Sequence, residues 1–78
     1  MKRRAGVDET LGARLKRIRV GKDLSQMELA FLAGVTRETV SRIELGTSYP
    51  RSDTVRKLCD ALGCSPNDLY AYTEGGNG

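Results

Sequence analysis

The 78-residue chain contains no histidine, only two cysteines and no long apolar run. Histidine is the side chain that most often moves protons in enzymes and completes nucleophilic triads, so its absence removes most of that chemistry. No apolar stretch approaches the roughly 18–20 residues that cross a bilayer, and no signal-peptide pattern opens the chain. These absences predict a protein of the cytoplasm that is not an enzyme and has no membrane segment.

The two cysteines, Cys59 and Cys64, do not form a metal or redox motif. Their spacing is not that of a C-x-x-C pair, and two thiols without histidine are too few ligands for structural zinc. Cys59 falls on the apolar stripe of a predicted helix, where we expect it to be a small buried hydrophobic residue. No metal and no cofactor are therefore expected.

Basic residues are concentrated at the start of the chain. Residues 1–22 hold eight lysines and arginines against two carboxylates, a net charge of +6, whereas residues 23–51 and 52–78 carry −1 and −2. A chain with one basic end favours a polyanionic partner. A solvated basic helix face with a floppy tail would give the same distribution, so charge alone does not choose between them.

Apolar residues recur at helical spacing through most of the chain, without the alternation typical of strands. Capping residues and glycines divide this pattern into five helices, over residues 9–22, 26–33, 37–45, 52–62 and 66–72. Residues 1–8 lack periodicity and are expected to form a flexible basic arm, and residues 73–78 a flexible glycine-rich tail. The sequence thus predicts one all-α domain over residues 9–72.

Short signatures mark the helix ends. Asp8 or Thr10 can cap the first helix, and the S-x-x-E pattern that begins at Ser25 is a capping box for the second. Gly34 can adopt the left-handed conformation that a tight turn requires. Thr36 is the next N-cap, so only a very short turn separates the second helix from the third.

Two helices joined by so short a turn cross at about 90–120°. The crossing requires a small residue at the contact, glycine in the turn and apolar side chains beneath it. The chain meets these demands with Ala30, Gly34, Val35, Val40 and Ile43. The joint match predicts a helix-turn-helix.

At about 100° per residue, the third helix separates its side chains onto two faces. Val40 and Ile43 fall on the apolar face, and the opposite face carries polar side chains, at Arg37, Glu38, Ser41 and Arg42. Arginine donates two hydrogen bonds to guanine, and glutamate accepts one from cytosine. A helix of this kind suits a major groove about 12 Å wide, so these four residues are candidates for reading bases.

The chain resembles the Cro/cI-type (XRE, lambda-repressor-like) helix-turn-helix domains of phage and bacterial transcription regulators. The resemblance covers residues 9–72 and is carried by LGARLKRIR, LSQMELAFLAGVTRETVSRIELG and PRSDTVRKLCDALGCSPNDLYAY. It implies a five-helix lambda-repressor-like bundle, with the helix-turn-helix at its second and third helices. The third helix would dock into DNA.

The resemblance also implies roles for individual residues. Gln26, Thr36 and Arg51 match phosphate-contacting positions of the family, and Thr39 is a further candidate. Tyr49 would either join Arg51 or fill the loop, and Lys22 would either reach a phosphate or stay solvated. Arg37, Glu38 and Arg42 match base-reading positions of the family. Arg19 and Glu44 resemble an ion pair that links the first helix to the end of the third and holds the latter in place.

Three features limit this transfer. Asp23 stands where the family usually has glycine, although aspartate tolerates positive φ better than most residues. The reading surface begins with Arg37-Glu38 in place of the usual glutamine, so no operator sequence can be carried over. The basic arm Lys2-Arg3-Arg4 invites comparison with arms that enter a DNA groove, but disorder without contact fits equally well.

These observations predict a transcriptional regulator, most simply a repressor, that binds a palindromic operator in double-stranded DNA as a homodimer. Its half-sites would lie about one turn, or ~34 Å, apart. The dimer surface is expected around the fifth helix, at Leu69, Tyr70 and Tyr72. Contact with RNA polymerase would give activation instead of repression. Two alternatives stay open: a DNA-binding antitoxin of a toxin–antitoxin pair, and a protein-interaction adaptor on the same fold.

Overall fold

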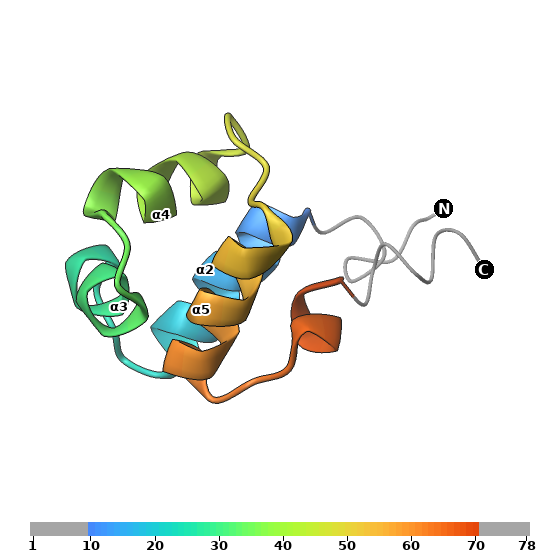
Figure 1. Cartoon of the computed structure of the whole chain (residues 1–78). Coiled ribbons are helices and arrows are strands. Elements are labelled where there is room, and N and C mark those ends of the chain that lie inside the picture. Colours follow the sequence, from blue (N-terminus) through green and yellow to red (C-terminus); the bar gives the residue numbers. More distant parts are fainter. Residues whose placement is uncertain (1–9, 71–78) are drawn as a thin grey trace, which may run out of the picture.

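The computed structural model describes residues 10–70, which form a helical domain without strands over that range (Figure 1). Its helices are α2 (Leu11–Gly21), α3 (Gln26–Ala33), α4 (Arg37–Leu45) and α5 (Ser52–Leu62), and residues 66–70 are helical as well. The predicted all-α class and the order of the helices are confirmed. The arm over residues 1–8 and the tail over residues 73–78 lie outside the described residues.

α2 begins at Leu11, after the second of the two caps that the sequence offered. Thr10 is its N-cap, because the Thr10 side chain accepts a hydrogen bond from the backbone N–H of Ala13 at 3.0 Å. Asp8, the other candidate cap, lies outside the described residues. Asp23 follows the end of the helix with a φ of 61°, so it takes the positive-φ position that the sequence assigned to this turn.

The capping box of α3 is present in full. The Ser25 hydroxyl accepts from the backbone N–H of Glu28 at 3.0 Å, and the Glu28 carboxylate accepts from the backbone N–H of Ser25 at 2.8 Å. Gly34 ends the helix with a φ of 73°, and Thr36 caps α4 directly afterwards. The helix-turn-helix therefore lies where its end signals placed it.

The core lies where the inner faces of the helices meet. α3 packs against both α4 and α5, and α4 also packs against α2. Buried apolar residues come from every helix: Leu11, Leu15, Leu29, Ala30, Ala33, Val40, Ile43, Val55, Leu58, Cys59, Leu62 and Leu69. Val35 is only partly buried against this cluster. No helix among residues 10–70 is both long enough and apolar enough to cross a membrane.

The burial of Leu69 corrects one sequence prediction. Leu69 is fully enclosed by its own domain, so its assignment to a dimer surface is wrong. The apolar side chain completes the core below the short last helix instead of facing a partner. Tyr70 is partly buried against the same core, and Tyr72 lies outside the described residues.

α2 and α4 approach so closely that only glycine fits between them. A Cβ atom placed on Gly12 would overlap the backbone carbonyl oxygen of Ile43 and lie 3.1 Å from the Cα atom of Glu44. Gly12 is therefore required by the distance between the helix backbones, although it stands inside a helix, where glycine is unfavourable. This contact sets how far the end of α4 stands from α2.

Candidate nucleic-acid interface

α4 divides its side chains between the core and solvent. Val40 and Ile43 are buried, whereas Arg37, Glu38 and Arg42 are exposed. In Figure 1, α4 lies at one edge of the molecule, so its outer side faces away from the other helices. The candidates for reading bases thus share an open surface, with the fourth of them, Ser41, half-buried at its border.

Two of these candidates pair with each other. The Nη2 atom of Arg42 donates to the Oε2 atom of Glu38 at 2.6 Å, one helical turn away, and the two side chains are 61% and 69% exposed. An exposed pair at this spacing contributes only about 0.3–0.5 kcal/mol, so a nucleobase can displace either partner. The pair also holds the guanidinium and the carboxylate side by side, on the surface that would meet a groove.

The start of α4 is organised by two threonines. The Thr36 hydroxyl accepts from the backbone N–H of Thr39 at 3.1 Å and lies 2.8 Å from the Thr39 hydroxyl. This arrangement satisfies one of the free N–H groups at the helix start. The positive end of the helix dipole stays at the surface beside both hydroxyls, a setting that favours an anion such as phosphate.

The end of α4 is anchored by the ion pair that the sequence pointed to. The Nε and Nη2 atoms of Arg19 donate to both carboxylate oxygens of Glu44, at 2.7 and 3.0 Å, and the Arg19 Nη1 atom donates to the Leu24 carbonyl at 2.7 Å. Gln26 adds a third donor to the same carboxylate, at 3.0 Å. We refer to Arg19, Leu24, Gln26 and Glu44 as the Arg19 cluster. It ties α2, the turn before α3 and the end of α4 together.

The ionised state of this pair is favoured by its geometry. The side chains of Arg19 and Glu44 are 9% and 3% exposed. Hydrogen bonding to Glu44 raises the pKa of the Arg19 guanidinium above its usual value, and this effect is larger than the lowering caused by burial. Arg19 therefore stays charged, and its partner is held in one orientation by two parallel hydrogen bonds.

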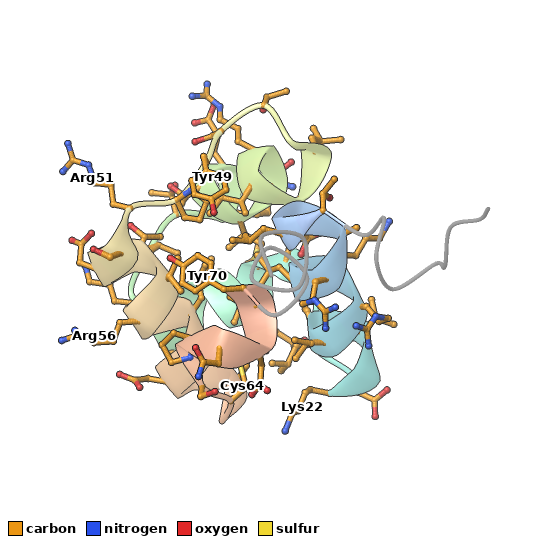
Figure 2. All side chains as sticks on the ribbon, turned by 90° about the vertical axis from the view of Figure 1, so that its right-hand side faces the viewer. Lys22, Tyr49, Arg51, Arg56, Cys64 and Tyr70 are labelled. Carbon is orange, nitrogen blue, oxygen red and sulfur yellow. The ribbon has the colours of Figure 1, made fainter. Side chains whose placement is uncertain are left out.

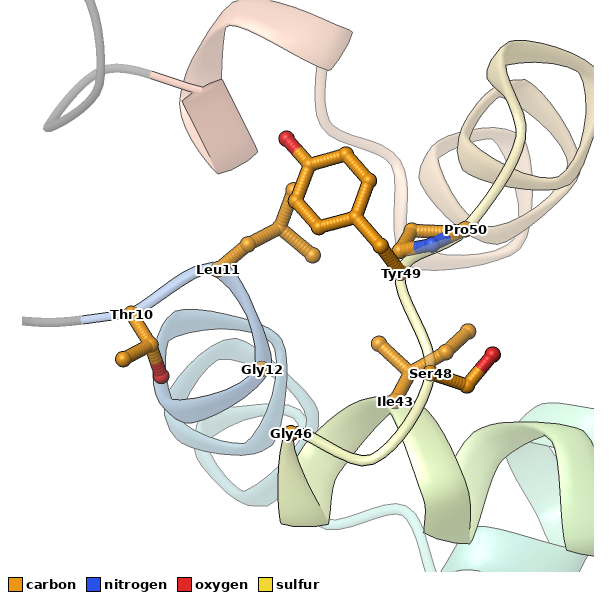
Figure 3. A pocket seen from close by; sticks show the side chains of 8 residues that line it. All are labelled: Thr10, Leu11, Gly12, Ile43, Gly46, Ser48, Tyr49 and Pro50. Carbon is orange, nitrogen blue, oxygen red and sulfur yellow. The ribbon is translucent and has the colours of Figure 1, made fainter.

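Tyr49 and Arg51 belong to the loop between α4 and α5. Both are exposed, and Figure 2 shows them on the side of the molecule where α4 lies. Lys22 lies at the opposite end of the same view. Its Nζ atom is close to Gly63, which follows the C-terminus of α5. The structure therefore places Arg51 toward the α4 end of the molecule and Lys22 at the opposite end. The Tyr49 ring lies over Leu11, on the side of α4 that packs against α2 (Figure 3).

The loop is supported by the start of α2. Tyr49, with Pro50 and Ser48, borders a pocket of about 250 Å³ whose other side is formed by Leu11 and Ile43 (Figure 3). Pro50 is buried, so the loop is fixed at its base while the Tyr49 side chain remains largely exposed. The position of Arg51 is thereby coupled to the packing of α2 against α4.

Sequence reasoning missed two residues that position this surface. Gly12 was not singled out, because a glycine within a helical pattern gives no sign of which backbone approaches it. Gln26 was assigned to a phosphate only, whereas its amide also donates to Glu44. Nothing in the spacing of Gln26 and Glu44 along the chain shows that the helix-turn-helix crossing brings them together.

Comparison with known proteins agrees with this geometry. A family model described as helix-turn-helix matches residues 15–69. The control protein C.BamHI of Bacillus amyloliquefaciens is 39% identical over 67 residues, which are 85% of this chain and 83% of that protein. Several other curated relatives are longer, and the chain spans 34% to 57% of their length.

Solved structures show the same architecture. The restriction-modification controller protein C.AhdI of Aeromonas hydrophila has a TM-score of 0.74 at 39% identity, over 76% of this chain and 89% of that one. The P22 c2 repressor, solved in complex with a synthetic operator, has a TM-score of 0.74 at 28% identity, over 78% and 92%. The chain therefore belongs to the Cro/cI-type (XRE) helix-turn-helix family.

Proposed function

We propose that the protein is a cytoplasmic, sequence-specific regulator of transcription that reads the major groove of double-stranded DNA with α4. The observation that carries the proposal is the fixed orientation of α4. Its apolar face is buried, the Arg19 cluster anchors its end, and the side chains of Arg37, Glu38 and Arg42 stand in solvent. Arginine and glutamate are side chains that distinguish guanine and cytosine by hydrogen bonding.

Phosphate contacts would surround this reading surface. Thr36 and Thr39 lie at the start of α4, and Gln26 at the start of α3. Arg51 and Tyr49 would add contacts from the following loop, where both side chains are exposed (Figure 2). Contacts from several elements fix the register of a protein on the duplex, which lets the bases be read at defined positions. The placement of Lys22 does not support its inclusion in this set.

The protein would bind as a homodimer to a palindromic operator. One module of this size covers only a few base pairs, and two copies related by a two-fold axis double the contact area and match two half-sites. Repression follows where the operator overlaps a promoter. Activation follows where the bound protein touches RNA polymerase.

In vitro selection from random double-stranded DNA tests this function. We expect enrichment of an inverted repeat whose half-sites lie about one helical turn, ~34 Å, apart. A library that enriches no sequence, together with no retardation of DNA in gels at low salt, would support the adaptor alternative. A toxin that co-purifies with the protein would support the antitoxin alternative, which uses the same surface.

Replacing Arg42 separates base reading from phosphate binding. Arg42→Ala should cost about 1–3 kcal/mol on the selected operator and relax the preference at one or two positions, because a bidentate contact to a base is lost. Arg51→Ala should weaken binding to all sequences alike. Competition titrations with single-base operator variants measure both effects, and an equal loss on every sequence for Arg42→Ala would assign it to a phosphate.

A further inference from the structure

Six of the eight residues of α3 are apolar, and they occupy its outer as well as its inner side, which is typical of a helix enclosed by its protein. Its inner side is buried, at Leu29, Ala30 and Ala33. Its outer side is not: Phe31 is 84% exposed, Met27 64% and Leu32 56%. Three large apolar side chains on one short helix therefore face solvent together.

These side chains border a groove. The groove has a volume of about 380 Å³ and is lined by Leu24, Met27, Glu28, Phe31 and Leu32. In Figure 1, α3 lies at the edge of the molecule, with α4 and α5 on its inner side. Single exposed hydrophobic residues are common on protein surfaces, but a contiguous patch marks a surface that binds something.

The charge of the groove indicates what would bind there. Glu28 is the one charged residue among those that line it, Asp23 precedes the lining residue Leu24, and residues 23–36 contain no lysine or arginine. This segment differs from the rest of a chain whose net charge is +3. Carboxylates repel phosphates, so the groove is unsuited to DNA. They also oppose a second copy of the chain, because a two-fold axis through the groove would place Glu28 close to its own counterpart.

We propose that this α3 groove binds an amphipathic helix of another protein, with bulky apolar side chains on one face and lysine or arginine at the edges of that face. Phe31 and Met27 would be the central contacts, as in other grooves that receive a helix. Five residues line the groove, against about 20–30 on each side of a standard stable interface, so the complex would be transient. The inference goes beyond DNA recognition and does not depend on it.

Two synthetic helical peptides test the proposal in the absence of DNA. One has a leucine face flanked by lysine, and the other has the same pattern with glutamate in place of lysine. We follow backbone amide shifts of the ¹⁵N-labelled full chain as each peptide is added. We expect saturable shifts confined to residues 24–32, and an affinity at least about threefold higher for the lysine peptide, because its charges are opposite to that of Glu28.

Phe31→Ser and Leu45→Ser form a matched pair of variants. Both side chains are large and apolar, and both are exposed, Phe31 at 84% and Leu45 at 74%. Neither substitution therefore opens a cavity in the core. Phe31→Ser should lower the affinity for the lysine peptide at least about tenfold. Leu45→Ser should leave that affinity unchanged. Circular dichroism checks that both variants fold.

Several outcomes would overturn the proposal. They are shifts spread over α2 or α5, equal binding of the two peptides, and unchanged binding by Phe31→Ser. A protein that dimerises through this face, shown by loss of the dimer in Phe31→Ser during sedimentation, would overturn it as well. Since Phe31→Ser should keep its affinity for the operator, failure of this inference and failure of DNA binding are observed separately.

Discussion

Arg19 is the residue on which the position of the reading surface depends most. It is a buried charge with all three nitrogens engaged, two with Glu44 and one with the Leu24 carbonyl. The pair is not a general source of stability, because desolvation offsets much of the attraction between buried charges. Its effect is specific: it fixes where α4 ends relative to α2.

Breaking this pair should be far more costly than breaking the exposed one. Glu44→Gln leaves Arg19 buried without a charged partner and should destabilise the fold by about 3–5 kcal/mol. Glu38→Gln removes the same chemistry from an exposed pair and should change stability by less than about 0.5 kcal/mol. Urea unfolding of both variants measures the difference, and equal losses would show that the Arg19 cluster is effectively solvated.

Cys59 gives the stability of the fold a dependence on alkaline pH. Burial, with a hydrogen bond to Cys64, raises the pKa of the Cys59 thiol from 9.0 to about 12. Between these values the unfolded chain loses the proton while the folded chain keeps it. The contribution of Cys59 to stability should therefore be constant below about pH 9 and decrease above it, by at most about 1.4 kcal/mol per pH unit.

Cys59→Ala provides the comparison. It should lower stability at every pH, because a buried side chain is shortened, yet show a smaller loss between pH 9 and 10.5 than the unchanged chain. Urea unfolding at pH 7, 9 and 10.5 measures how the stability of the unchanged chain and of Cys59→Ala depends on pH. Identical slopes would mean that other groups control the alkaline limit.

Among the secondary-structure elements, the contact between α2 and α4 decides how the surface is presented. Gly12 lets the two backbones meet, and the loop after α4 rests on the first turn of α2 (Figure 3). The cluster around Glu44 then holds the same junction by charge. The close contact at Gly12 and the ion pair of Glu44 thus both hold the C-terminal end of α4, and neither covers its outer face.

Alanine substitutions at the two glycines of α2 distinguish the effect of close packing from the effect of helix propensity. Alanine at Gly12 would clash with Ile43 and Glu44, and we expect a loss of about 1–3 kcal/mol or more together with weaker DNA binding. Alanine at Gly21 meets no atom within 4 Å and should stabilise the helix by about 0.4–1 kcal/mol. Thermal unfolding compares the two. A Gly12→Ala protein as stable as Gly21→Ala would contradict the close approach.

At the scale of the whole molecule, charge and apolar surface are divided between different faces. α4 and the loop after it carry three exposed arginines, at Arg37, Arg42 and Arg51, whereas the outer face of α3 has no basic residue. One face is suited to a polyanion and the other to a protein. Such a division lets a regulator bind DNA and a second partner at the same time.

The dependence of DNA affinity on salt tests the first of these faces. Each phosphate neutralised by a basic side chain contributes about 0.9 to the slope of log affinity against log salt concentration. Arg51→Ala should reduce that slope by about one for each copy bound. Lys22→Ala should leave it unchanged, because Lys22 lies beside Gly63 and away from α4. A slope reduced by Lys22→Ala and unchanged by Arg51→Ala would place the phosphate backbone at the end of the domain where Lys22 lies.

Much of the fold could be predicted because its signals are local. Ser25 and Thr36 cap helices through their own neighbours, and Gly34 and Asp23 take positive φ where the turns demand it. The outer face of α4 followed from the spacing of Val40 and Ile43. Each of these depends on residues only a few positions apart, which a pattern in the sequence records directly.

What the sequence by itself determined is therefore the order of the helices, the turn between α3 and α4, and the side chains that α4 shows to solvent. The tertiary structure alone decided which distant groups meet: Gly12 with Ile43, Gln26 with Glu44, and Leu69 with the core instead of a partner. It also separated Lys22 from the reading surface and left the apolar outer side of α3 open. The physical reason is that such contacts arise from the packing of whole helices, whose relative positions are set by many weak interactions at once.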